Sequence, residues 1–206
     1  SIFYIGPEGI INAKDIKIHN DKTYIENHGQ ILVKTWSKGG GAATVYNMCL
    51  IQAETSIDFT DIGGLFMDGG IVIAPQVIAK TTPIELRNGA MLKCDKFTTE
   101  GTCTITGHEV GNRSLVKNQT IAKSGSGSLY VSGHVTLENN SSAISVNTRN
   151  GADMAPYDNA SIVIEGCKSK GNPGDEGEEP EEPEFPIVTP VTGKYTYLFE
   201  DNWPLY

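Results

Sequence analysis

The sequence predicts an all-β fold, a parallel β-helix or β-solenoid with coils of roughly 20 residues. Short strand-like runs recur about every seven residues. The gaps between them are rich in glycine and asparagine, and almost none has the periodicity of a helix. The runs are centred near Ile57, Leu65, Val72, Ile78, Glu85, Met91, Thr104, Leu115, Ile121, Leu129, Val135 and Ile144.

Several runs alternate with the two-residue period of a strand, as in Cys103-Thr104-Ile105 and Val135-Thr136-Leu137. The gaps hold pairs such as Gly63-Gly64 and Asn88-Gly89, whose residues tolerate the positive φ of sharp corners. Three runs to a coil give roughly 20 residues a coil, a period typical of solenoids.

An antiparallel β-sandwich is the alternative. Sandwich strands are usually spaced about 8–12 residues apart, and the spacing here is tighter. Two-residue hairpin signals are also few, because Asn88-Gly89 and Asn150-Gly151 are the only Asn-Gly pairs in the chain.

The solenoid is expected over residues 1–168. It opens with an apolar strand, Ile2-Phe3-Tyr4-Ile5, where a solenoid terminus needs a polar cap, so we expect further sequence before Ser1. No segment reads as a signal peptide, and no apolar run is long enough to span a membrane as a helix.

An acidic, proline-rich linker is expected over residues 169–192. The net charge of the chain is −9, and seven acidic residues fall between Asp175 and Glu184. Without them the chain has 18 acidic and 16 basic residues, so we expect no nucleic-acid surface. Proline and charge repulsion favour an extended spacer, which could also attract cations or a basic partner.

An aromatic strand is expected over residues 193–206. Tyr195, Tyr197 and Phe199 would share one face of it, and Trp203 follows. So much apolar surface needs a partner: the solenoid, the rest of a truncated second domain, or another protein chain. We therefore predict that these four residues dock onto a protein, for example by adding a strand to a sheet edge.

The segment Tyr195-Thr-Tyr-Leu-Phe-Glu-Asp-Asn-Trp-Pro204 resembles the opening strand of the LruC-type domain of Bacteroides-type surface proteins. Two patches, Val45-Tyr46-Asn47-Met48-Cys49 and Leu65-Phe66-Met67-Asp68-Gly69-Gly70, are similar to the glycine-rich repeats that precede that domain. The resemblance implies an exported, lipid-anchored protein of the outer-membrane surface, with no known enzyme activity.

The chain has four cysteines, and two interpretations of the pair Cys94 and Cys103 are open. Cys94 and Cys103 flank an expected polar loop, Asp95 to Thr102, and would form a disulfide if their strands were neighbours and the compartment oxidising. Otherwise they are small buried hydrophobic residues. Zinc is disfavoured, because no Cys-x-x-Cys pair occurs.

Catalytic motifs are missing from the sequence: there is no zincin spacing of histidines, no Gly-x-Ser-x-Gly and no phosphate-binding loop. The best cation candidate is a calcium site formed by Glu54, Asp58, Asp61 and Asp68 stacked on adjacent coils. The alternative is that these are isolated turn residues. Asp153, Asp158 and Asn159 form a weaker cluster.

We therefore expect a non-enzymatic cell-surface scaffold or adhesion protein, acting either alone or as a subunit of an outer-membrane complex. One alternative is a glycan-binding module, in which Trp36, Tyr46 or Tyr130 would line a groove. The other is a β-helix polysaccharide lyase or hydrolase, whose site would be assembled across coils.

Overall fold

The computed structural model describes residues 1–19, 22–140, 146–149 and 151–159. All of them belong to the first of two compact units, Ser1–Lys170. The described residues contain strands and turns and no helix, so none of their segments is a helix that could cross a bilayer.

The strands form two eight-stranded sheets, in which every neighbouring pair is parallel. Sheet A contains the odd-numbered strands: β1 (Ile2–Ile5), β3 (Tyr24–Asn27), β5 (Thr44–Asn47), β7 (Gly64–Asp68), β9 (Pro83–Arg87), β11 (Thr102–Gly107), β13 (Ser128–Gly133) and β15 (Val146–Arg149). Sheet B contains the even-numbered strands: β2 (Ile10–Ile16), β4 (Gln30–Trp36), β6 (Leu50–Asp58), β8 (Ile71–Ala79), β10 (Met91–Thr99), β12 (Ser114–Lys123), β14 (Val135–Asn139) and β16 (Asp153–Ala155).

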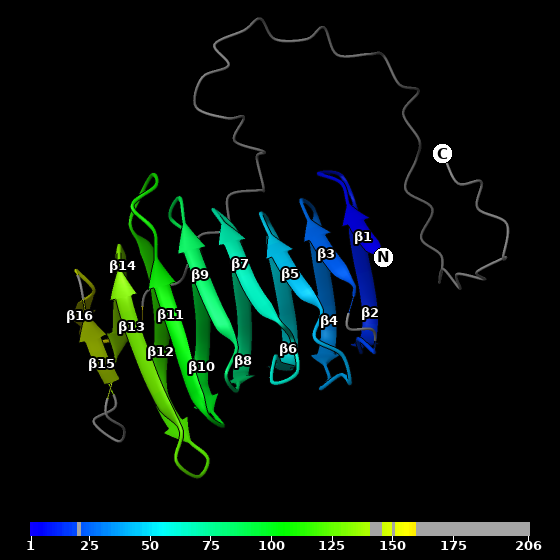
Figure 1. The fold of residues 1–206 in the computed structure, drawn as a ribbon. Helices are drawn as coiled ribbons and strands as arrows, with labels where there is room; N and C mark the ends of the chain where they lie inside the picture. The colour runs from blue at the N-terminus through cyan, green and yellow to red at the C-terminus, as the bar shows by residue number, and fades with distance from the viewer. Residues whose placement is uncertain (20–21, 141–145, 150, 160–206) are drawn as a thin grey trace, which may run out of the picture. The chain divides into compact units, whose positions relative to one another are not determined.

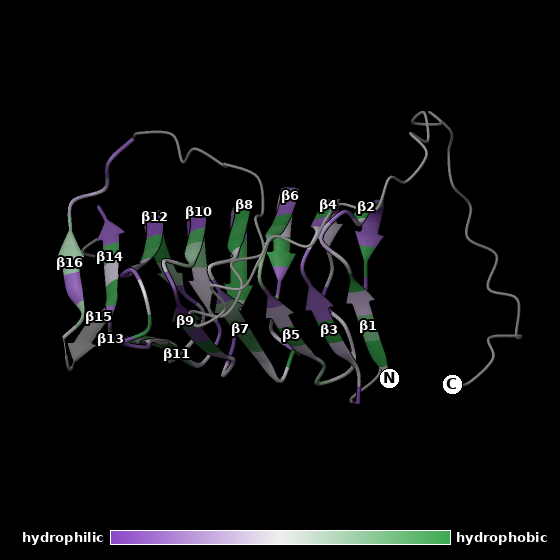
Figure 2. Ribbon diagram, turned by 90° about the horizontal axis from the view of Figure 1, so that it is seen from above, coloured by the Kyte–Doolittle hydropathy of each residue, from purple (hydrophilic) through white to green (hydrophobic). Residues whose placement is uncertain are grey.

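Each coil is one sheet A strand followed by one sheet B strand. Val45 pairs with Ile25 on one side and Leu65 on the other, so successive coils are about 20 residues apart. Figure 1 shows the strands stacked from β1 and β2 at one end to β15 and β16 at the other, and Figure 2 shows the two sheets as separate layers. The predicted β-solenoid is confirmed, and the antiparallel sandwich is wrong.

The sheet B strands bend in the middle, which explains why three apolar runs fill one coil. In β8, Ala74 pairs with Cys94 and Gln76 with Lys96, while Pro75 between them is unpaired and exposed. Proline has no N–H to donate to the ladder, so the bend is a position that tolerates it. The runs centred on Val72 and Ile78 are therefore two halves of one strand.

The core consists mainly of inward-facing aliphatic side chains that stack in rows along the solenoid. In sheet A the residues on either side of them face outward, which is the alternation seen in the sequence. Burial of each of these inward-facing side chains stabilises the folded state by about 1.5–3 kcal/mol. Two of these rows are Ile25, Val45, Leu65, Ile84, Ile105, Val131, and Ile31, Ile51, Val72, Leu92, Val116, Leu137.

The corner from sheet A to sheet B is held by buried asparagines. Asn27 and Asn47 end β3 and β5 and are fully buried. Asn27 Nδ2 donates to Asn47 Oδ1 (2.8 Å) and to the Leu50 carbonyl (3.0 Å), and Asn47 Nδ2 donates to the Ile71 carbonyl (3.0 Å). The amides thereby tie three successive coils together.

The Asn88-Gly89 turn does not form a hairpin. Both residues have positive φ, 56° and 71°, and the turn carries the chain from β9 in sheet A to β10 in sheet B. The same backbone chemistry that closes hairpins therefore closes a solenoid corner here.

Candidate functional site: an aromatic groove on the outer face of sheet A

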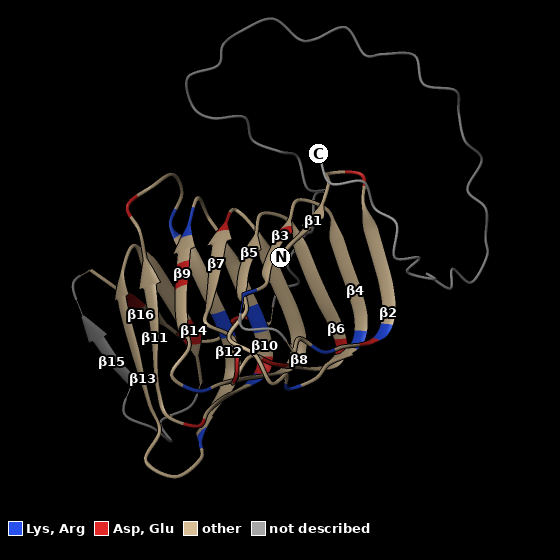
Figure 3. Ribbon diagram, turned by 45° about the vertical axis from the view of Figure 1, so that its right-hand side comes forward, with Lys and Arg blue, Asp and Glu red and all other residues tan. Residues whose placement is uncertain are grey.

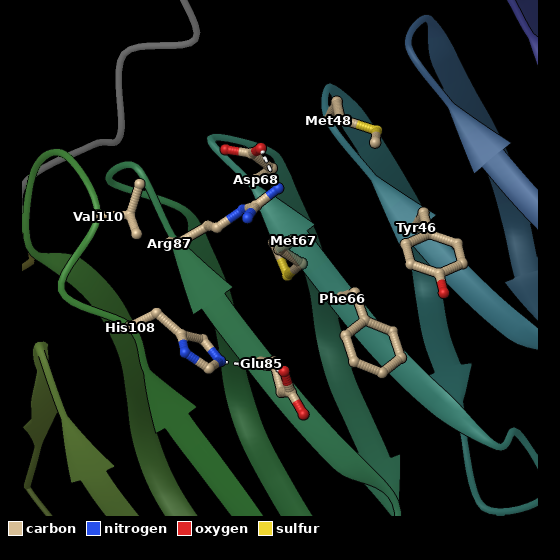
Figure 4. A pocket seen from close by; sticks show the side chains of 9 residues that line it. All are labelled: Tyr46, Met48, Phe66, Met67, Asp68, Glu85, Arg87, His108 and Val110. Carbon is tan, nitrogen blue, oxygen red and sulfur yellow. Dashed lines mark hydrogen bonds and ion pairs between the residues drawn. The ribbon is translucent and has the colours of Figure 1, made fainter. Parts of the chain in front are cut away.

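A shallow groove of about 280 Å³ lies on the outer face of sheet A. It extends over β5, β7 and β9 to the loop that follows β11 (Figure 4). Its lining residues are Tyr46, Met48, Phe66, Met67, Asp68, Glu85, Arg87, His108 and Val110. Most of these residues are at outward positions, while Met67 is a buried core residue.

Coil stacking brings these residues together. Tyr46 pairs with Phe66, and Phe66 with Glu85, so the three form one outward row on consecutive strands. Their chain neighbours Val45 and Leu65 face inward and are fully buried. The core therefore fixes the backbone from which the groove residues project.

An aromatic platform, Tyr24, Tyr46 and Phe66, forms one part of the site. The ring centroids of Tyr46 and Phe66 are 5.2 Å apart with an interplanar angle of 22°, and those of Tyr24 and Tyr46 are 6.4 Å apart with an angle of 21°. The rings of Tyr46 and Phe66 lie side by side on the outer surface (Figure 4). Tyr24 is 48% exposed, and the other two are half-buried.

Gly64 makes room for the Phe66 ring. A Cβ at position 64 would lie 2.8 Å from Phe66 Cε2, which is closer than real Cβ contacts. The ring thus rests against the backbone of its own strand. A side chain at this position would push the ring away from the sheet.

Two ion pairs form the polar end of the groove. Glu85 Oε2 lies 3.0 Å from His108 Nε2, and Arg87 NH2 lies 2.8 Å from Asp68 Oδ2. Asn88 Nδ2 also donates to Asp68 Oδ1. These side chains are 30–52% exposed, so the pairs add little stability, and they leave donors and acceptors open to a ligand.

The four carboxylates of the predicted calcium site do not converge. Asp68 pairs with Arg87, Asp61 lies 3.7 Å from Lys38 Nζ, and Asp58 accepts from the backbone N–H of Thr60 (2.9 Å). Glu54 projects outward at the bend of β6 in the other sheet. The prediction was wrong because turn carboxylates cap their own loops or pair with local cations. Among the described residues, no three His, Cys, Asp or Glu side chains are arranged to hold a metal.

The second acidic cluster expected from the sequence, Asp153, Asp158 and Asn159, does not form a shared site either, because its acidic residues interact with other residues. Asp153 pairs with Arg113 (2.9 Å), and the Asp158 N–H donates to Glu138 Oε2 (3.4 Å).

The predicted Cys94–Cys103 disulfide is wrong, because both thiols are free and buried. The stretch after Cys94 is not a loop: it continues β10, with Phe97 and Thr99 facing inward. Cys94 therefore belongs to sheet B and Cys103 to sheet A. Burial raises the pKa of both thiols, that of Cys103 to about 12.

Cys49, in contrast, is disulfide-bonded, which the sequence analysis did not predict. It is buried at the corner just before β6.

Of the aromatic residues proposed to contact glycans, only Tyr46 lies in the groove. Trp36 is 1% exposed, and its ring packs against Phe59 in the core. Tyr130 is half-buried on β13, away from the groove lining. The predicted docking residues Tyr195, Tyr197, Phe199 and Trp203 lie outside the described residues.

Glu85, Arg87 and His108 were not identified from the sequence as site residues. The signal that was present is the pair of similar patches around Tyr46 and Phe66, which are outward positions of two consecutive coils. Extending that alignment by one more coil leads to Glu85.

A second, more open hollow lies on sheet B over β2, β4 and β6. It has about 540 Å³ and is lined by Asn12, Ala13, Lys14, Leu32, Val33, Lys34, Gln52 and Glu54. Along the ribbon of the described residues, basic and acidic positions are interspersed (Figure 3).

The chain matches no family model, no curated protein and no solved structure.

Proposed function

We propose that this chain is a non-enzymatic, adhesive scaffold of the cell surface, and that the outer face of sheet A is its contact surface. The observation that carries the proposal is the row of partly exposed aromatic rings beside paired charges. Exposed aromatic groups of this kind are typical of interaction sites.

The solenoid suits this function because it holds the groove residues on strands. Their backbone is paired on both sides and backed by fully buried aliphatic rows. Contact groups on such rigid elements lose little conformational entropy on binding.

Two observations support export. The Cys49 disulfide is typical of an oxidising compartment. The resemblance of residues 195–204 to the LruC-type domain implies a lipid-anchored protein on the outer face of the outer membrane. We propose that location for this chain.

Labelling of intact source cells tests the location. An affinity-tagged chain should react with a membrane-impermeant amine reagent before lysis, as a known surface protein does. Labelling only after lysis, as for a cytosolic control protein, would contradict the proposed location.

A polysaccharide lyase or hydrolase is the second candidate, because two carboxylates, Asp68 and Glu85, line the same groove. Each of them already pairs with a basic side chain, and their side chains are 30% and 40% exposed, whereas general acids are usually more fully desolvated. Release of new reducing ends or unsaturated products from polysaccharides that the protein binds would favour the enzyme.

Docking of a protein partner through the aromatic segment 193–206 remains a prediction. We expect that deletion of this segment abolishes co-purification of that partner from membranes and leaves the thermal unfolding of the solenoid unchanged. Undiminished co-purification would argue against this docking.

A further inference from the structure

We propose that the groove binds a neutral, linear saccharide that lies across the strands, parallel to the stacking direction of the coils. The inference rests on the proposed contact surface and names its ligand. Its two parts are the aromatic platform and the polar end described above.

The platform calls for a ligand with repeated flat, apolar faces. Tyr24, Tyr46 and Phe66 lie on consecutive sheet A strands, and their ring centroids are 6.4 and 5.2 Å apart. Pyranose rings present such a face through their axial C–H groups, and a linear saccharide repeats it along a line. Aromatic rings with a polar tip, such as those of the two tyrosines, can also bond the hydroxyls at the edge of the sugar.

The polar end calls for groups that both donate and accept hydrogen bonds. Arg87 supplies only donors, Glu85 and Asp68 supply acceptors, and His108 supplies either. Sugar hydroxyls match this mixture because each donates one hydrogen bond and accepts others. Figure 4 shows these four side chains grouped at one end of the aromatic pair.

The charges of the groove favour a neutral ligand over an anionic one. Arg87 is matched by Asp68, and Glu85 adds a second carboxylate, while no lysine lines the groove. A uronic acid polymer or a nucleic acid would have to bring its negative charges beside these carboxylates.

The length of the site sets the size of the ligand. From Tyr24 on β3 to Glu85 on β9 the site crosses four neighbouring strands, a span of roughly 14 Å at the usual strand spacing. One pyranose unit is about as long as one strand spacing, so the site would hold about three units. Monosaccharides should therefore bind much more weakly than longer chains.

Titration calorimetry with defined saccharides tests the proposal. The probes are cellohexaose, laminarihexaose, mannohexaose and chitohexaose, the corresponding monosaccharides, and hyaluronan and polygalacturonate as anionic comparators. We expect at least one hexasaccharide to bind, more than about tenfold tighter than its monosaccharide. We also expect Tyr46→Ala and Phe66→Ala each to weaken binding about tenfold.

Tyr130→Ala is the matched control, because it removes an outward-facing tyrosine of the same sheet away from the groove. Its affinity should equal that of the unchanged protein, and unfolding curves check that every variant is folded. The proposal is overturned if no neutral probe binds, if an anionic probe binds more tightly, or if Tyr130→Ala weakens binding as much as Tyr46→Ala. Binding of the labelled protein to intact cells tests the adhesive function independently of the saccharide. Binding would support the adhesive function even if the saccharide proposal is wrong, and lack of binding would contradict it.

Discussion

Asn27 and Asn47 are 20 residues apart in the chain, and their buried side-chain amides are joined by a hydrogen bond of 2.8 Å. The bond exists because one coil lies directly on the next, so corresponding corner residues meet. Both amides also bond to backbone groups of the following coil. The hydrogen bonds of this corner thus stabilise the fold. They also hold the ends of the strands from which the groove residues project.

Replacing Asn47 by alanine should destabilise the protein by about 1–3 kcal/mol, because the carbonyls of Cys49 and Ile71 and the buried Asn27 amide each lose one hydrogen bond. Urea unfolding measures the change. Asn12→Ala, at an exposed position, is the control and should change stability by less than about 0.5 kcal/mol. Equal effects of the two substitutions would contradict the role of the corner.

Replacing Arg113 should loosen the last described coils. Its guanidinium donates to Thr136 Oγ1 (3.0 Å), the Val135 carbonyl (3.0 Å) and the Gly151 carbonyl, and pairs with Asp153 (2.9 Å). We expect Arg113→Ala to cost about 1–2 kcal/mol, a range reduced because Asp153 is largely exposed.

Hydrogen exchange measures this effect locally. Amides of β14 and β16 should exchange faster in Arg113→Ala, while those of β4 and β6 stay unchanged. Uniformly faster exchange, or none at all, would show that Arg113 does not hold these coils together.

Gly64→Ala should weaken saccharide binding with little effect on folding. The new Cβ would lie 2.8 Å from Phe66 Cε2, so the ring must move while the backbone, whose φ is not positive, accepts alanine. Calorimetry with the tightest hexasaccharide probe should show a several-fold loss of affinity. Gly40→Ala, at an exposed loop position, is the control, and an equal affinity of both variants would contradict the role of the Phe66 ring.

Cys94 and Cys103 should resist iodoacetamide in the native protein. Burial raises their pKa values, so at pH values near 8 almost no thiolate forms, and the alkylating reagent has no access to either sulfur. Mass spectrometry should find both cysteines unmodified in the native protein. After unfolding in guanidinium without any reductant, it should find both cysteines alkylated. Rapid native labelling, or a peptide in which the two are cross-linked, would contradict the structure.

The solenoid could be predicted because its packing repeats a local pattern. Eleven of the twelve run centres identified in the sequence lie on strands, and Ile144 lies outside the described residues. The early coils are less evident, because β2 carries polar residues such as Asn12 and Asp15 among its apolar ones. Their strands are defined by pairing with the next coil, which the sequence does not display.

The groove could not be predicted from the sequence, because the register between coils decides which side chains lie next to one another. Asp68 illustrates this: grouping it with the acids before it suggested a cation site, whereas pairing of β7 with β9 places it beside Arg87. The number of residues between paired positions changes from coil to coil with turn length, as the pairs Thr44–Gly64 and Asp68–Arg87 show. Aligning the sequence with a constant repeat of 20 residues therefore pairs the wrong residues after a few coils.

Contact between the rings of Tyr46 and Phe66 tests the central claim most directly, because stacking of consecutive coils requires β5 and β7 to lie side by side with these two residues paired. In a protein with protonated Tyr and Phe rings on a deuterated background, nuclear Overhauser spectra should show cross-peaks between these two rings, whose centroids are 5.2 Å apart. Phe66→Leu identifies the signals by removing them. Absence of the cross-peaks from the folded protein would contradict both the stacking of the coils and the groove built on it.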